Sequence, residues 1–159
     1  MKKVCLDMNE NNNCIAVLKK NIDFIQAGVT VYSMPVEYKN AEYCNFADKY
    51  DVHFIFDDMV VEVDFYTVPR VDIMAVDSNN GYIGTVGEIS GLESNGPICY
   101  IDKNREVFLI AEDFREFLEN IECWKERLKK YDEISFFNSK EEAEKSYEFI
   151  DVGKCVYNT

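Results

Sequence analysis

The chain has 159 residues, of which 30 are acidic and 17 basic, so its formal net charge is −13 at pH 7. A surface of this charge repels phosphate backbones, because nucleic-acid binding depends on Lys and Arg side chains that displace counterions. The composition therefore argues against DNA or RNA binding. The same charge should attract basic partners, although it also serves solubility alone.

Hydrophobic residues make up 47% of the chain and aromatic residues 14%. This apolar content is enough to offset the conformational entropy that folding costs. No linker rich in Pro, Gly or Ser divides the sequence, so we expect residues 1–159 to form one domain.

The sequence lacks the signals expected of a secreted, membrane-spanning or zinc-binding protein. The N-terminus carries two lysines without the apolar run of a signal peptide, and no apolar stretch reaches the length of a membrane span. The six cysteines are too widely spaced for a C-x-x-C pair or a Cys/His zinc site. We therefore expect a cytoplasmic protein with free thiols, without a membrane segment and without a bound metal.

The first 50 residues favour two helices and a short strand. Apolar residues at helical spacing predict a helix over residues 13–27, which Gly28 would end. Residues 29–32 are β-branched or aromatic and predict a strand. After Pro35, the pattern predicts a second helix over residues 36–49.

The middle of the chain favours strands, because apolar residues alternate with other residues and turn signals separate the runs. Asn80-Gly81 is a strong hairpin signal, and the glycines between residues 87 and 96 indicate a mobile loop. The predicted strands lie at residues 52–56, 61–66, 71–75, 82–86, 97–101 and 107–110.

The last 50 residues favour helices. Apolar residues at i, i+3, i+4 and i+7 predict a helix that begins near Phe114, and Lys129 and Lys130 would suit its C-terminus if it extends that far. Ser139 and Glu142 match a capping box and predict a last helix that reaches about residue 149. This order predicts an α+β fold with a mostly antiparallel meander sheet of five to six strands, packed with N-terminal and C-terminal helices.

No catalytic or cofactor-binding motif is present. His53 is the only histidine, so any Ser–His or Cys–His machinery would have to pass through it, and no G-x-S-x-G elbow presents a serine. We expect His53 to be a surface or edge residue of a strand. The glycines at 81, 84 and 87 fit neither phosphate-loop pattern and are explained by a hairpin and a loop.

Four carboxylates gather in a short segment: Asp57, Asp58, Glu62 and Asp64. Glu62 and Asp64 should share one face of a strand. Three interpretations stay open: a solvated acidic face, a docking strip for a basic partner, or a carboxylate pair that acts in acid–base catalysis or ligand binding. The third requires a pocket in which the pKa values of the carboxyl groups are perturbed.

Three segments resemble the SUKH superfamily, which includes glucan-synthesis regulators and many bacterial immunity proteins of toxin systems. Residues 71–84 (VDIMAVDSNNGYIG) resemble its strand, glycine-bearing turn and strand. Residues 97–102 (PICYID) resemble its "gP-x-x-x-i-D" strand, and residues 111–118 (AEDFREFL) resemble its "A-x-S-F-x-x-F-L" helix start, with Asp113 in place of the helix-capping serine. Residues 35–38 (PVEY) are similar to its upstream "L-P-x-x-Y" helix.

The resemblance implies an α+β domain that works by binding protein partners and has no catalytic residues. Its most concrete form is an intracellular immunity protein that neutralises a cognate toxin. An acidic inhibitor would suit a basic nuclease toxin, since carboxylates compete with phosphate for the same surface. The alternatives are a small enzyme or ligand-binding protein that uses the acidic residues near 57–64, and a regulatory scaffold of the same fold without a toxin partner.

Overall fold

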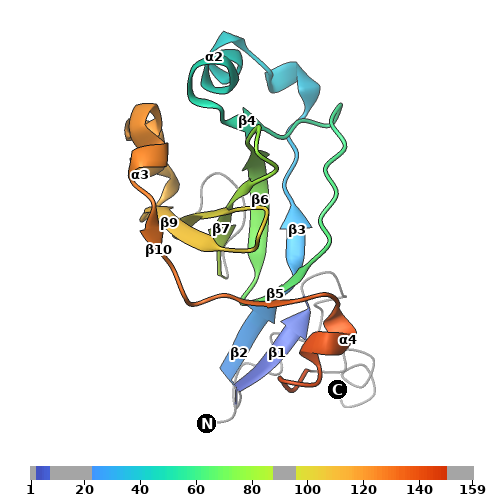
Figure 1. Cartoon of the computed structure of the whole chain (residues 1–159). Helices are drawn as coiled ribbons and strands as arrows, with labels where there is room; N and C mark the ends of the chain where they lie inside the picture. The colour runs from blue at the N-terminus through green and yellow to red at the C-terminus, as the bar shows by residue number, and fades with distance from the viewer. Residues whose placement is uncertain (1–2, 8–22, 88–95, 150–159) are drawn as a thin grey trace.

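The computed structural model describes residues 3–7, 23–87 and 96–149, and Figure 1 shows their arrangement. The fold is α+β and is built on a seven-stranded sheet that is mostly antiparallel, which confirms the predicted fold class. Six strands follow the order β10-β9-β8-β7-β6-β3. The seventh, β4 (His53–Phe54), pairs with the last two residues of β6, beyond the part of β6 that β3 occupies.

The centre of the sheet is the predicted antiparallel meander. Its strands are β6 (Val71–Val76), β7 (Tyr82–Val86), β8 (Ile98–Ile101) and β9 (Val107–Ala111). The β6–β7 hairpin places Asn80 in the left-handed region with a φ of 64°, as the Asn-Gly signal predicts. At the two edges, β10 (Lys129–Lys130) runs antiparallel to β9 and β3 (Val29–Val31) runs parallel to β6, so the sheet is mixed.

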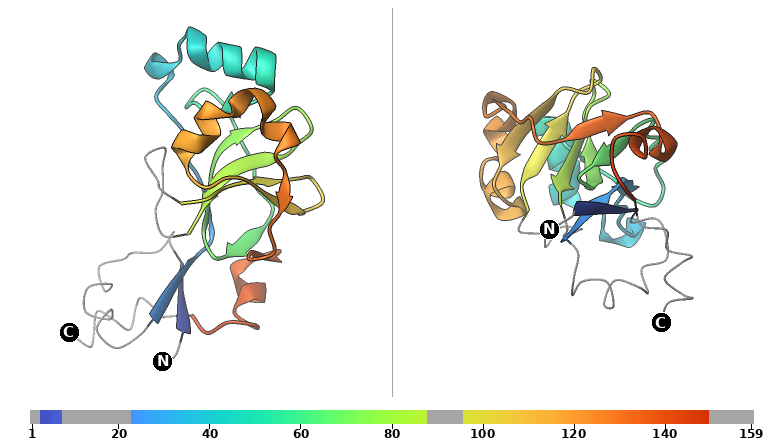
Figure 2. Two further views of the ribbon diagram at one scale, coloured as in Figure 1. Left: turned by 90° about the vertical axis from the view of Figure 1, so that its left-hand side faces the viewer. Right: turned by 90° about the horizontal axis from the view of Figure 1, so that it is seen from below.

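Helices cover one face of this sheet. They are α2 (Ala41–Tyr50), α3 (Phe114–Glu119) and the 3-10 helix η2 (Ile121–Glu126). In the left view of Figure 2, α3 and η2 lie in front of the strands. The core between the layers is rich in aromatic side chains and includes Phe54, Phe56, Met74, Tyr100, Phe117 and Trp124. Burial of this apolar surface is the main force that holds the helices on the sheet.

Irregular chain covers the opposite face. Residues 61–65 and 131–134, together with Phe136, pack there against side chains of the central strands, among them Ile73, Cys99 and Ile101. Phe65 contributes to this core with edge-on ring contacts to Tyr82 and Phe136.

A smaller layer lies at one end of the molecule, and α2 lies at the other (Figures 1 and 2). It contains the parallel pair β1 (Lys3–Asp7) and β2 (Asp23–Ala27), the antiparallel pair β5 (Tyr66–Val68) and β11 (Ser135–Phe137), and the short helix α4 (Lys140–Ala143). Its buried core consists of Cys5, Ala27, Tyr66, Val68 and Ala143. These strands and their pairing were not predicted, apart from the residue at the start of β5.

Three predicted helices differ from the structure. The helix predicted at 36–49 is divided, because residues 36–38 form a 3-10 helix and the Asn40 side chain caps α2, which begins at Ala41. Residues 23–27 of the helix predicted at 13–27 form strand β2, because pairing with β1 and burial of Ala27 outweigh the helical spacing, and residues 13–22 lie outside the described ranges. The helix predicted to reach residue 149 ends at Ala143, and Phe149 forms a parallel bridge with Cys5 instead. The loop predicted at 87–96 also falls largely outside the described ranges.

Two further boundaries differ for local reasons. The strand predicted at 61–66 begins only at Tyr66, because residues 61–65 cross the face of the sheet. There the Tyr82 hydroxyl donates a hydrogen bond to the Glu62 carbonyl at 2.9 Å. The helix that begins at Phe114 ends at Glu119, where the Asn120 side chain donates to the Glu116 carbonyl at 3.0 Å. Lys129 and Lys130 therefore lie in strand β10 rather than at a helix end.

Within the described ranges, no helix has the length and apolar character needed to cross a membrane.

Candidate functional site

The four predicted carboxylates lie on one exposed segment, residues 57–64, which connects β4 to β5. Their side chains point away from the core, while Val61 and Val63 between them pack against the sheet. The alternation that the sequence showed is thus real, although no strand pairing accompanies it. We name Asp57, Asp58, Glu62 and Asp64 the acidic strip.

The first half of the acidic strip is fixed to the segment between β3 and α2. Asp57 Oδ1 accepts a hydrogen bond from the Ser33 hydroxyl at 2.6 Å, and the Asp57 N–H donates to the Met34 carbonyl at 2.9 Å. Asp58 forms an ion pair with Lys39 at 3.8 Å. This turn therefore holds two carboxylates at a defined place on the surface.

The second half lines an open hollow of about 660 Å³ at the other end of the segment. Glu62 and Asp64 share its lining with three charged residues of the β8–β9 turn: Asp102, Lys103 and Arg105. The Arg105 guanidinium lies 5.8 Å from the centre of the Phe65 ring and 3.9 Å from Asp64 Oδ1. Because the Asp64 side chain is 91% exposed, this ion pair is screened by water and contributes little to stability.

The two halves do not converge on one cavity. Asp57 and Asp58 contact Ser33 and Lys39, whereas Glu62 and Asp64 face the β8–β9 turn, and no neighbour is shared in these contacts. Acid–base chemistry by paired carboxylates needs both groups at one reacting atom. The four carboxylates therefore do not form one acid–base site in the structure.

Exposed apolar side chains lie beside Asp57 and Asp58, and sequence reasoning missed them. Their exposed fractions are 39% for Val31, 38% for Tyr32, 45% for Val36, 60% for Tyr38 and 90% for Val60. The sequence assigned all but Val60 to a strand or a helix, where apolar residues are expected to face a core. A usable signal was Pro35, which caps the start of the 3-10 helix η1 (Val36–Tyr38), a helix without buried residues.

A second hollow, of about 360 Å³, opens between α2 and the turn that follows β4. Tyr43, Phe54, Phe56 and Met59 give it apolar walls, and Lys39 lies across its edge with its ammonium 5.6 Å from the centre of the Phe56 ring. His53 also lines this hollow.

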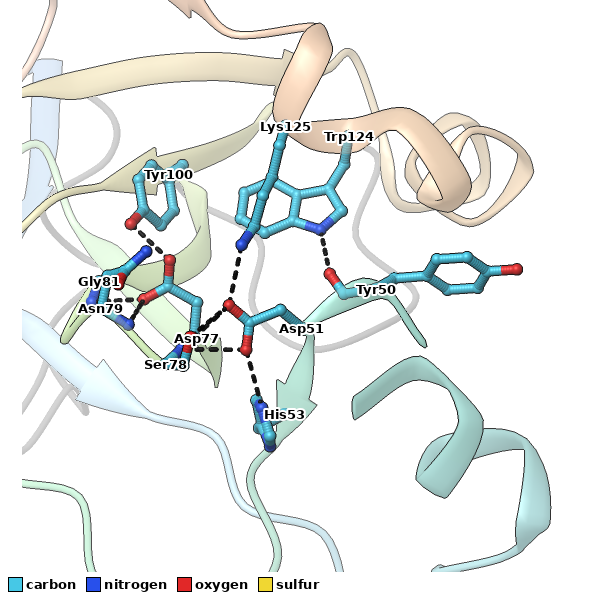
Figure 3. A network of polar contacts seen from close by, with 10 residues as sticks. All are labelled: Tyr50, Asp51, His53, Asp77, Ser78, Asn79, Gly81, Tyr100, Trp124 and Lys125. Carbon is cyan, nitrogen blue, oxygen red and sulfur yellow. Dashed lines mark hydrogen bonds and ion pairs between the residues drawn. The ribbon is translucent and has the colours of Figure 1, made fainter. Parts of the chain in front are cut away.

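A polar network at the C-terminus of α2 fixes that part of the surface (Figure 3). Asp51 ends the helix in the left-handed region with a φ of 59°. Its carboxylate accepts hydrogen bonds from Lys125 Nζ at 2.8 Å and from the Ser78 hydroxyl at 2.7 Å, and His53 Nε2 lies 3.0 Å away. Burial alone would raise the pKa of Asp51, but the hydrogen bonds from Lys125, Ser78 and His53 hold it well below its usual range.

This network contains Ser, His and Asp, but not in the order of a catalytic triad. A triad places the imidazole between the serine and the carboxylate, so that the imidazole can take the serine proton. Here Asp51 lies in the middle, and both Ser78 and His53 contact it. The arrangement can bind α2, β4, the β6–β7 turn and η2 together, but it does not activate Ser78 as a nucleophile. His53 is half-buried at the edge of the sheet, close to its predicted position.

The neighbouring carboxylate, Asp77, is buried in the β6–β7 turn. It accepts hydrogen bonds from the Tyr100 hydroxyl at 2.6 Å and from the Gly81 N–H at 2.7 Å. Burial, together with the hydrogen bond to Asp77, raises the pKa of the Tyr100 hydroxyl. A Cβ atom at position 81 would overlap the Tyr100 ring, so glycine is required there by close packing. These residues shape the turn.

The described cysteines, Cys5, Cys44, Cys99 and Cys123, are free thiols. Burial raises the pKa of Cys5 to about 11 and that of Cys99 to about 12, so these two thiols stay protonated at neutral pH. Among the described residues, no group of three or more His, Cys, Asp or Glu side chains is placed to hold a metal ion.

The segments that resemble the SUKH superfamily form a strand–turn–strand unit (β6 and β7), the strand β8 and the start of α3. Asp113 caps α3, since its side chain accepts from the Glu116 N–H at 2.8 Å, and so fills the role of the serine that it replaces. Such local elements occur in many folds, and the resemblance to the family stays a prediction. Comparison of the chain with models of protein families, with curated proteins and with solved structures found no match.

Proposed function

We propose that this protein is a non-catalytic protein-binding module that acts in the cytoplasm as an immunity protein and neutralises a cognate toxin. The observation that carries the proposal is the acidic strip, in which Asp57, Asp58, Glu62 and Asp64 all face solvent along one segment. The resemblance to the SUKH superfamily supports the toxin as partner.

Electrostatics supports a basic partner. With a net charge of −13, the chain attracts cationic surfaces at long range and speeds their encounter. The acidic strip then offers carboxylates spaced along an extended surface, as the phosphates of a nucleic acid are. A toxin that binds nucleic acid would present a basic surface, and the acidic strip could occupy it and exclude the substrate.

Co-expression with the product of an adjacent toxin gene tests the proposal. We expect a complex that survives purification and cells that are protected from the toxin. Replacing all four carboxylates by amides (D57N, D58N, E62Q and D64N) should weaken the complex and make it less sensitive to salt. A control with the same loss of charge at exposed acids elsewhere (E122Q, E126Q, E141Q and E144Q) should bind as the original chain does.

Each outcome separates the candidates. Neither complex nor protection would refute the immunity function. A stable complex with a partner that is not toxic would instead favour a regulatory scaffold. Equal binding by the strip variant and its control would show that the acidic strip is not the contact surface.

The hollow beside Glu62 and Asp64 favours a second candidate, the binding of a small ligand. Its mixture of carboxylates with Lys103 and Arg105 would suit a zwitterion such as an amino acid. Calorimetric titration with the twenty amino acids, against a D64N and R105Q variant, would detect such binding.

A further inference from the structure

Exposed apolar residues lie on two segments, 32–38 and 57–60, which the Met34–Asp57 hydrogen bond and the Lys39–Asp58 ion pair join. We name Tyr32, Val36, Tyr38 and Val60 the Tyr38 patch. Val31 is exposed as well, but as the neighbour of Tyr32 in extended chain it points to the opposite side. The side chain of Tyr38 is 60% exposed and that of Val60 is 90% exposed. Single apolar residues are normal on a protein surface, but four on two joined segments offer a contact surface for a partner.

The backbone beneath the Tyr38 patch is held firmly. Met34 is buried, and its N–H donates to the Ile55 carbonyl at 2.9 Å while its carbonyl accepts from the Asp57 N–H at 2.9 Å. The η1 turn is closed by the hydrogen bonds from the Tyr38 N–H to the Pro35 carbonyl and from the Lys39 N–H to the Val36 carbonyl. A surface fixed in this way loses little conformational entropy when a partner binds, which favours affinity.

The hollow between α2 and the turn after β4 is lined by chain neighbours of two patch residues. Lys39 follows Tyr38 directly and lies across the edge of that hollow, and Met59 precedes Val60 and forms part of its wall. An apolar side chain of a partner could enter the hollow and contact Phe54 and Phe56 while the rest of the partner covers the patch. Such an anchor surrounded by flatter contact is the common form of a protein-binding hot spot.

The charges around the patch define the occupant. Glu37, Asp57 and Asp58 lie at its rim, and in residues 31–39 and 57–60 the only cation is Lys39, which is paired with Asp58. A second copy of this chain would bring like charges together, and a nucleic acid would bring phosphates against carboxylates. A protein surface that presents an aliphatic or aromatic side chain next to Lys or Arg complements both the apolar side chains of the patch and the negative charges at its rim.

We propose that the Tyr38 patch, with the adjoining hollow, is the main docking surface of this protein, and that it binds a protein segment in which apolar side chains alternate with Lys or Arg. This inference rests on the proposed protein-binding function. It assigns most of the binding free energy to the patch rather than to the acidic strip. The acidic strip steers the basic partner, and the patch supplies most of the affinity because its aromatic side chains lose water on contact.

Selection from a phage library of random twelve-residue peptides tests the proposal without knowledge of the partner. The matched variants are Y32S, V36S and Y38S together, and the control L118S and L128S, which removes exposed apolar side chains elsewhere. All these side chains are exposed, so both variants should fold, which a thermal denaturation curve checks. We expect enriched peptides to combine apolar residues with Lys or Arg and to bind the patch variant at least about tenfold more weakly than the control.

Three results would overturn the proposal: no enrichment above background, equal binding to the patch variant and the control, or enriched peptides without basic residues. Concentration-dependent dimers in sedimentation that disappear in the patch variant would make a second copy the occupant and would overturn it as well. The outcome is separable from that of the toxin experiment. Protection that survives in the patch variant would refute the patch and keep the function, whereas selected patch peptides without any toxin would refute only the immunity function.

Discussion

The carboxylates near the two ends of strand β6 differ in how many hydrogen bonds they accept. At the end that leads into the β6–β7 turn, Asp77 accepts hydrogen bonds from the Tyr100 hydroxyl and from the N–H groups of Asn79 and Gly81. Asp51 lies close by and is bonded to three further elements. Here every carboxylate has several donors, and the bonds join segments that are distant in the sequence.

At the other end of β6, Asp72 is just as buried but less well bonded. Its Oδ1 atom accepts from Arg70 Nε at 2.8 Å and from the Thr30 hydroxyl, whereas its Oδ2 atom has no hydrogen-bond partner. Thr85 lies directly opposite on β7, and its hydroxyl is also buried without a partner. Each such group carries a desolvation cost that is not repaid.

The difference indicates which end of the sheet supports the proposed docking surface. The well-bonded end adjoins α2 and β4, which line the hollow next to the Tyr38 patch. The less well-bonded end pairs with β3, whereas the hollow lies at the end of β6 that pairs with β4. Substitutions at the two ends can break or sharpen this contrast.

The largest effect is expected from Asp77→Ala. The substitution leaves the buried Tyr100 hydroxyl and two backbone N–H groups without an acceptor, so the free energy of unfolding should fall by about 3 kcal/mol. Urea denaturation measures it. Asp102→Ala is the matched control, because Asp102 bonds the Asn104 and Glu106 N–H groups in a more exposed turn, and it should cost about 1 kcal/mol. Equal losses of stability in the two variants would show that the hydrogen bonds of Asp77 matter no more than those of the exposed Asp102 turn.

Gly81→Ala should cost about 2 kcal/mol of stability, because the added Cβ meets the Tyr100 ring, which its bond to Asp77 holds in place. Gly87→Ala provides the comparison. A Cβ there has open space around it, but the φ of 111° is unfavourable for alanine, and the expected cost is about 1 kcal/mol. Thermal unfolding of both variants ranks them, and a larger loss at position 87 would contradict the packing argument.

The turn at Asp77 shows how far sequence reasoning reaches. The alternation of residues 71–76 and the Asn-Gly pair predicted the hairpin correctly, because both signals act over a few residues. Strand β2 was missed because its pairing with β1 depends on residues far away in the chain, and helical spacing of apolar residues cannot reveal such a partner. The link between Asp51 and Lys125, 74 residues apart, is beyond any local pattern.

The candidate site was partly predictable in the same way. The acidic strip can be located from the sequence alone, and the structure shows its four side chains exposed. The Tyr38 patch was not predicted, because apolar residues such as Val36 and Tyr38 are interpreted as core residues unless the fold is known. Only the three-dimensional path after Pro35 shows that they face outward.

Asp51→Asn should make stability less dependent on pH. The pKa of Asp51 is lowered in the folded protein, so its contribution is complete above the unfolded value near 4 and is lost as the pH falls toward the folded value. The variant should be less stable by about 1.5 kcal/mol at pH 7, and the difference should shrink steadily below about pH 4. Urea denaturation at a series of pH values measures this, and a constant difference would show that the charge of Asp51 is not what matters.

The smallest effect, and the only favourable one, is expected from Thr85→Val at the other end of β6. Valine has nearly the shape of threonine and removes a buried hydroxyl that has no partner, so the free energy of unfolding should rise by up to about 1 kcal/mol. Thr67→Val is the control, since the buried Thr67 hydroxyl donates to the Pro69 carbonyl at 2.8 Å, and it should lose about 1 kcal/mol. Opposite signs in urea denaturation would confirm that the Thr85 hydroxyl, unlike that of Thr67, is buried without a partner. A loss at position 85 would mean that its hydroxyl is bonded in solution, and that the contrast between the ends is smaller than the structure indicates.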